Sequence, residues 1–231
     1  MSTYLQLCQR LRSESGTSGT NTSVPTSISG AAGEWGRLCD WVSQAWSEIQ
    51  EEHENWEWMR KNVTFNTVAQ QSEYTPTGTE IALTDFGSWR KNSFRAYLTS
   101  AGVGSEQRLG YKGYEAFRDY YMLSSRRITY ARPTEITVAP NKSLMLGLAP
   151  DADYTVSGEY FKTPQILSAD ADTPEMPARF HMLIVYRAMM SYGAYNAANE
   201  VYQRGEAEYK KMLNKLRMDQ LPGITRGGSL I

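Results

Sequence analysis

The sequence predicts an α+β protein: a helical bundle built from N- and C-terminal helices, with a small antiparallel β domain inserted between them and an extended C-terminal arm. Two observations predict this architecture. Apolar residues recur at helical spacing near both ends of the 231-residue chain, and the middle alternates at the spacing of strands. The predicted domains are a discontinuous helical domain of residues 1–60 and 176–221, a β-rich domain of residues 61–175, and an arm of residues 222–231.

The composition limits the classes of protein to consider. The formal net charge of −1 does not predict a general nucleic-acid-binding surface. Cys8 and Cys39 form no CxxC motif, which favours free thiols in a reducing compartment. The N-terminus lacks the apolar core of a secretory signal, and no run approaches the roughly 18 apolar residues of a membrane span. We therefore expect a soluble protein, assembled in the cytoplasm, with no membrane contact.

The N-terminal region is expected to hold one short helix and a long polar loop. Residues 2–14 place apolar side chains at helical spacing, and Ser2 or Thr3 can cap the helix. Residues 15–33 are rich in Ser, Thr and Gly and contain almost no large apolar group, which predicts a loop. A loop of this length inside a compact domain tends to be functional or ordered by a partner.

Five of the six tryptophans fall within residues 33–60, with glutamates between them. On a helix, most of these tryptophans line one apolar face and the glutamates lie outside it, which predicts a core-facing helix. A ligand cage would need convergent polar groups, and a nucleic-acid stacking platform would need Lys and Arg between the rings. The predicted face comprises Trp35, Leu38, Cys39, Val42, Ala45, Trp46, Ile49, His53 and Trp56; Trp41 lies at its flank and Trp58 beyond the helix end.

The middle of the chain changes to a period of two. Residues 62–77 are β-branched and alternating, with Val63, Phe65 and Tyr74 as expected inward positions. A hairpin is expected around the Pro-Asn-Lys turn at residues 140–142. The remaining predicted elements are strands at 93–100, 134–139, 143–148 and 153–164, and a short helix at 113–125.

The helical period returns at Pro177, a residue suited to the first turn of a helix. Gly193 and Asn196 predict a helical hairpin or a strongly kinked helix, broken near residues 194–198. The last ten residues have three glycines and no period, which predicts an extended tail. The expected apolar stripe comprises Phe180, Leu183, Ile184, Ala194, Tyr195, Ala198, Val201, Tyr202, Tyr209, Met212, Leu213 and Leu216.

The histidines and cysteines do not predict a catalytic, cofactor or metal site. His53 and His181 have no ligand-type neighbour at the spacing of a metal motif. Cys8 and Cys39 lie on apolar helix faces, which raise a thiol pKa and disfavour a nucleophile. We therefore expect a protein that is not an enzyme and needs no cofactor.

Other motifs support the same expectation. The pairs Asp151/Asp153 and Asp170/Asp172 lie beside strand ends and prolines, where turn chemistry explains them. The chain contains no GxGxxG, Walker or GxSxG motif.

The C-terminal end is basic in an otherwise slightly acidic chain. From residue 210 onward the positive residues are Lys210, Lys211, Lys215, Arg217 and Arg226, and the one negative side chain is Asp219. These cations can compensate the dipole of the last helix. They can also form a docking arm for an acidic partner, and the extended tail with its apolar ends favours this second interpretation.

The chain resembles the head-to-tail adaptor proteins of tailed bacteriophages. Four stretches carry the resemblance: "YLQLCQRLRSESGTSG", "GEWGRLCDWVSQAWSEIQEEHENWEWMR", "RPTEITVAPNKSLMLGLAPDADYTVSGEYFKTP" and "MPARFHMLIVYRAMMSYGAYNAANEVYQRGEAEY". It implies a structural protein of the virion neck, assembled in the host cytoplasm, whose dodecameric ring beneath the portal protein joins the DNA-filled head to the tail. It further implies contacts with neighbouring adaptor subunits and with tail or nozzle proteins. Genomic DNA would pass through the lumen without sequence-specific binding.

The resemblance also implies that the C-terminal arm reaches the portal. Two other functions remain possible from the residues: a monomeric helical adaptor or assembly chaperone, and a nucleic-acid-binding module that uses the basic C-terminus. The expected portal-binding residues are Arg217, Pro222, Gly223, Ile224, Thr225, Arg226, Leu230 and Ile231.

Overall fold

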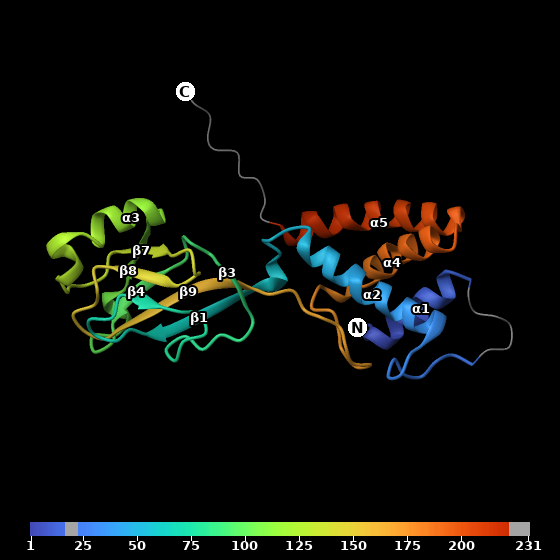
Figure 1. The fold of residues 1–231 in the computed structure, drawn as a ribbon, viewed down its shortest axis with the longest axis horizontal. Helices are drawn as coiled ribbons and strands as arrows, with labels where there is room; N and C mark the ends of the chain where they lie inside the picture. Colours follow the sequence, from blue (N-terminus) through green and yellow to red (C-terminus); the bar gives the residue numbers. More distant parts are fainter. Residues whose placement is uncertain (17–22, 222–231) are drawn as a thin grey trace, which may run out of the picture. The chain divides into compact units, whose positions relative to one another are not determined.

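The computed structural model describes residues 1–16 and 23–221 and has the predicted α+β fold (Figure 1). The chain divides into two compact units: a helical unit of Met1–Met59 with Pro164–Ile231, and a β-rich unit of Arg60–Thr163. Within the described part of the chain, no helix combines the length and the apolar character that crossing a bilayer requires.

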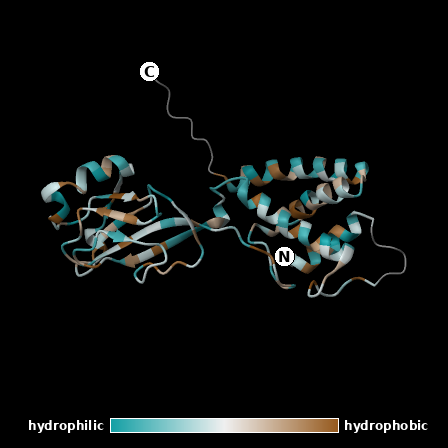
Figure 2. Cartoon of the chain, viewed as in Figure 1, coloured by the Kyte–Doolittle hydropathy of each residue, from teal (hydrophilic) through white to brown (hydrophobic). Residues whose placement is uncertain are grey.

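In the part of the chain that the structure describes, the helical unit contains four α-helices: α1 (Tyr4–Glu14), α2 (Gly33–Glu51), α4 (Met182–Tyr195) and α5 (Asn199–Gln220). Helix α4 is central, because α1, α2 and α5 all pack against it. Each helix carries hydrophilic and hydrophobic residues along its length (Figure 2), and its apolar residues form the core.

The first helix begins with the capping predicted from the sequence. The Thr3 hydroxyl accepts a hydrogen bond from the Gln6 N–H at 3.3 Å, and the Gln6 side chain accepts one from the Thr3 N–H at 3.0 Å. This reciprocal capping box satisfies two backbone donors that the helix itself leaves without partners.

The tryptophan-rich stretch forms core, but its helix is shorter than predicted. Helix α2 ends at Glu51, so Trp56 does not lie on the helical face. The chain turns back instead, and the Trp56 indole donates to the Ile49 carbonyl at 3.1 Å while the side chain is fully buried. Trp58, predicted to lie off the apolar face, stacks on Trp56 and Trp46 with ring centroids 4.5 Å and 6.3 Å apart.

The predicted break in the C-terminal helices is confirmed by the turn between α4 and α5. The turn also corrects the predicted stripe, because Ala194 and Tyr195 lie at the turn and are exposed. The two helices approach closely at Gly205, where a Cβ atom would lie 2.9 Å from the Tyr186 carbonyl oxygen. The sequence pattern did not reveal this contact, because a buried glycine adds nothing to an apolar period.

The β-rich unit contains two sheets. The first holds β1 (Arg60–Asn66), β9 (Tyr154–Lys162), β4 (Arg95–Leu98) and β5 (Gln107–Arg108) in that order, and β3 (Phe86–Trp89) also pairs with β9. The second holds β2 (Glu73–Tyr74), β8 (Leu144–Gly147), β7 (Glu135–Val138) and β6 (Gly110–Tyr111) in that order. Helix α3 (Tyr114–Tyr121) follows β6.

Residues from both sheets share one apolar core, which includes the predicted inward positions Val63, Phe65 and Tyr74. The predicted hairpin is also confirmed, since β7 and β8 are antiparallel with Val138 opposite Leu144.

Three features of the sheets differ from the sequence prediction. Residues 62–77 form β1 and the short β2 rather than one strand, and β3, β5 and β6 were not predicted. The pair β6–β7 is parallel, although the domain was predicted to be antiparallel. The missed strands span two to four residues, too few to display a period of two.

Residues 164–175 group with the helical unit, although they were predicted to belong to the β-rich domain. Specific hydrogen bonds hold them there. The Gln50 side chain accepts from the Gln165 N–H at 2.7 Å and donates to the Gln165 carbonyl at 2.9 Å. The Tyr4 N–H donates to the Asp172 carbonyl at 2.7 Å. These residues lack a helical or strand period, so their location depends on contacts that sequence patterns do not encode.

Candidate interaction surfaces

The expected portal-binding residues are concentrated at the C-terminus, and all of them except Arg217 lie outside the described residues. Arg217 lies in the last turn of α5, where its Nε donates to His53 Nε2 at 3.1 Å. The same guanidinium forms an ion pair with Glu52, which also accepts a hydrogen bond from the Tyr209 hydroxyl at 3.3 Å. Burial and the nearby Glu52 charge raise the pKa of Tyr209 to about 12. The end of α5 is therefore tied to the end of α2.

The lysines of α5 differ in how far their charge is balanced. Lys210 pairs with Glu206 at 2.7 Å and Lys211 with Glu208 at 3.6 Å. Lys215 is exposed and has no ion pair with the residues that the structure describes. Exposed pairs one turn apart on a helix stabilise it only slightly. The basic character predicted for this end is thus partly offset within α5 itself.

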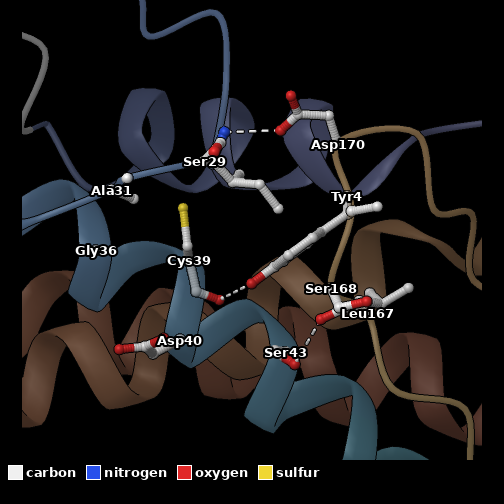
Figure 3. A pocket seen from close by; sticks show the side chains of 13 residues that line it. Tyr4, Ser29, Ala31, Gly36, Cys39, Asp40, Ser43, Leu167, Ser168 and Asp170 are labelled. Carbon is white, nitrogen blue, oxygen red and sulfur yellow. Dashed lines mark hydrogen bonds between the residues drawn. The ribbon is translucent and has the colours of Figure 1, made fainter.

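A pocket of about 700 Å³ in the helical unit lies between α1, α2 and the segments that precede α2 and follow β9 (Figure 3). Several polar groups around this pocket are bonded to one another. Asp170 accepts from the Ile28 N–H at 2.7 Å and from the Ser27 hydroxyl at 2.8 Å. The Tyr4 hydroxyl donates to the Cys39 carbonyl at 2.8 Å. The hydrogen bonds of this pocket hold the loop before α2 in place, which is a structural role.

The histidine and cysteine side chains also serve the core. His181 is 2% exposed, accepts from the Ser2 N–H at 3.1 Å through Nδ1, and has Nε2 3.1 Å from the Met176 carbonyl. Burial lowers its pKa. Cys8 and Cys39 are buried free thiols, and the hydrogen bond between them, with burial, raises the pKa of Cys8. Residues 1–16 and 23–221 contain no group of three or more His, Cys, Asp or Glu side chains placed to hold a metal.

A second candidate surface, which was not predicted from the sequence, lies in the β-rich unit. Helix α3 and the 3₁₀ turn Ser124–Ile128, together with the residues around them, expose large apolar side chains. Exposed fractions range from 43% at Tyr120 to 71% at Ile128, and the Arg126 guanidinium lies 3.9 Å from the centroid of the Tyr120 ring. We call this the α3 surface; it comprises Tyr120, Leu123, Arg126, Ile128 and Tyr130.

The composition of the α3 surface is that of a protein-binding site. Clustered exposed apolar side chains mark interaction sites, and aromatic residues and arginine are enriched in protein interfaces. Phe117, on the same helix, is 1% exposed and packs with Met145 of β8, which fixes α3 on the second sheet. In the sequence, this surface is marked only by tyrosines and arginines that lie close together in residues 114–132. A search for apolar residues at helical spacing does not detect such a composition.

Two compact units, with a basic helix end on one and an apolar, arginine-containing surface on the other, are typical of a structural protein that connects partners. The model of the SU10 adaptor protein family matches residues 2–227, so the chain belongs to that family. It is therefore a phage structural adaptor protein and a component of the virion, from a family that is structural rather than catalytic. No curated protein matches the chain. The family match confirms the resemblance to phage adaptors; portal binding stays a prediction.

Proposed function

We propose that this adaptor forms a ring beneath the portal protein, in the virion neck, and joins the DNA-filled head to the tail. The ring follows the dodecameric symmetry of the portal and continues the channel through which genomic DNA passes. The family match, which runs from residue 2 to residue 227, is the observation that carries the proposal. It includes both units and the first residues of the arm, so the whole chain is of the adaptor type.

The portal contact is assigned to residues 222–231, which are separated from α5 by Leu221 alone. Arg217 supports this role by holding the end of α5 against Glu52 and His53, so that the arm starts from a defined position. Lys215 and Arg226 add positive charge near the contact. Attraction to an acidic portal rim would increase the association rate more than the final affinity.

The α3 surface is assigned to the tail or nozzle proteins. It lies in the β-rich unit, whereas the arm follows the helical unit, so two partners can bind one subunit without competing for the same residues. Its exposed tyrosines and isoleucine supply apolar anchors, and Arg126 supplies a planar cation beside them.

Removal of residues 222–231 tests the portal assignment. Truncation after Leu221 leaves all four helices of the helical unit complete, so the circular dichroism spectrum and the melting temperature should stay close to those of the full chain. Addition of the truncated protein to portal-bearing heads should be abolished. As a matched control, Ile128→Ser should still bind heads but should reduce tail attachment.

A truncated protein that completes heads at the normal rate would contradict the arm assignment, and the portal contact would then be sought in residues 15–33. Size-exclusion chromatography with light scattering, with and without portal, separates the ring from the alternative of a monomeric adaptor or chaperone. The alternative of a nucleic-acid-binding module at the basic C-terminus predicts DNA binding that the same truncation weakens and that falls steeply with salt.

A further inference from the structure

The first sheet of the β-rich unit carries a pocket of arginines on its outer face. On β4 and β9, Ala96 and Val156 point into the shared core, so their neighbours along the strand point the opposite way. The pocket measures about 360 Å³ and collects side chains from four separate segments of the chain: β1, residues 90–95, β5 and β9. We call it the arginine pocket; its lining is Arg60, Arg90, Asn92, Ser93, Arg95, Arg108 and Glu159.

The lining has one carboxylate for four guanidinium groups, a formal excess of three positive charges. Glu159 accepts from Arg60 Nε at 2.8 Å and Arg60 Nη2 at 2.6 Å, and it also pairs with Arg90. These hydrogen bonds, first from Arg60 and then from Arg90, lower the pKa of Glu159. Glu159 is thus engaged by two of the arginines, and its charge cannot balance all four.

The other two arginines lie directly opposite each other. The register of β4 and β5 pairs Arg95 with Arg108, and like charges at opposed positions destabilise a sheet. The carboxylate of Glu106 is 3.8 Å from Arg95, and Arg108 donates to the Asn92 backbone carbonyl at 2.9 Å. An anion bound between Arg95 and Arg108 would be attracted to both guanidinium groups and would offset the repulsion between them.

We propose that the arginine pocket binds phosphate groups of a nucleic-acid backbone. The guanidinium fork matches the geometry of phosphate oxygens. Each arginine has five N–H donors, so Arg95 and Arg108 keep donors beyond those that the Glu106 carboxylate and the Asn92 carbonyl accept. The lining contains no aromatic ring on which a base could stack, so the contact is with the backbone and carries no sequence preference.

The same lining argues against an acidic protein as the ligand. Protein interfaces have apolar or aromatic anchors at their centre, as the α3 surface does, and the arginine pocket is lined only by polar and charged residues. This site deepens the proposed function and rests on it, because the phosphate groups would come from the DNA that passes through the ring. Binding itself can be measured on the free protein.

The test compares two double variants that remove the same charge from the β-rich unit. Arg95→Gln/Arg108→Gln changes the pocket, and Arg118→Gln/Arg127→Gln changes exposed arginines outside it. Fluorescence anisotropy with a labelled oligothymidylate measures affinity over a series of salt concentrations, and circular dichroism checks the fold. The pocket variant should bind at least about tenfold more weakly, and the control should stay within about twofold of the unmodified protein. The slope of log affinity against log salt should become shallower by about 1.4, as for two lost single-strand phosphate contacts.

Additional probes separate the possible ligands. Inorganic phosphate should shift the arginine side-chain NMR signals of the unmodified protein and should compete with the oligonucleotide. Equal weakening by both double variants, or no binding of either phosphate probe, would overturn the proposal. Tighter binding of polyglutamate than of oligothymidylate would do the same and would indicate an acidic protein partner. Normal head completion by the pocket variant would leave the proposed function intact, because the arm and not the pocket is assigned to the portal.

Discussion

Replacement of Trp46 by alanine tests whether the tryptophan cluster is core or interface. The side chain is fully buried in the helical unit and stacks on Trp58. Removal of a large buried aromatic side chain costs about 3–5 kcal/mol, through lost transfer energy and the cavity left behind. Trp46 should lie in this range, because its side chain is fully buried and its ring packs on Trp58, which lies outside α2.

The structure also predicts a milder effect for Trp46→Phe. The Trp46 indole N–H is buried without a hydrogen-bond partner among the described residues, so phenylalanine removes an unsatisfied donor as well as part of the ring. These effects oppose each other, and the net loss should be about 1–2 kcal/mol.

Urea unfolding followed by far-ultraviolet circular dichroism is the suitable assay, since α1, α2, α4 and α5 lie in the helical unit and tryptophan fluorescence would change with the substitution itself. Met218→Ala, at a position 87% exposed on α5, is the control and should change stability by less than about 0.5 kcal/mol. If Trp46→Ala unfolds like the unmodified protein but no longer joins heads, the core interpretation is wrong and Trp46 contacts a partner.

Three further predictions follow from single contacts. Gly205→Ala should lower the free energy of unfolding by about 1–3 kcal/mol, because the added Cβ would lie 2.9 Å from the Tyr186 carbonyl oxygen. This loss should outweigh the helix-favouring effect of alanine. As a control, Gln203→Ala at an exposed position of the same helix should have little effect. Burial lowers the pKa of His181, so the unfolded chain binds the proton more readily and the free energy of unfolding should fall as pH drops below about 6.5, the pKa of an unfolded histidine. In urea titrations over this pH range, the free energy of unfolding of His181→Gln should depend less on pH. An identical pH dependence in the variant and the unmodified protein would contradict this. The purified protein should carry no stoichiometric transition metal by elemental analysis; about one metal per chain that is lost in His181→Ala would overturn this expectation.

Local signals in the sequence were sufficient for several elements. The N-terminal cap of α1 at Ser2 or Thr3, the apolar face of α2, the β7–β8 hairpin and the break between α4 and α5 were all predicted from residues a few positions apart. The Gln6 half of the capping box was seen only in the structure. The cap, the hairpin turn and the helix break depend on residues that are close in sequence. The apolar face of α2 is visible because its apolar residues recur at helical spacing. The basic charge at the C-terminus could be read in the same way.

Other features depend on residues that meet only in the folded chain. The apolar spacing of α2 did not reveal that the helix ends at Glu51. Trp56 continues that spacing, but it reaches the same apolar core from the turn after the helix. Gly205 carries no apolar signal, yet it sets how closely α4 and α5 pack. The α3 surface appears only once Phe117 is buried and its neighbours are left exposed.

The sequence by itself determined the class of fold, the helical character of both chain ends and the resemblance to phage adaptors, because period, capping and turn chemistry are local. Only the tertiary structure decided that residues 164–175 belong with the helices and that Arg217 is held by Glu52 and His53. It also decided that four arginines from three separate segments line one pocket with Glu159. Strand register and loop docking bring these residues together, and register is set by pairing between segments, which no single segment of the sequence encodes.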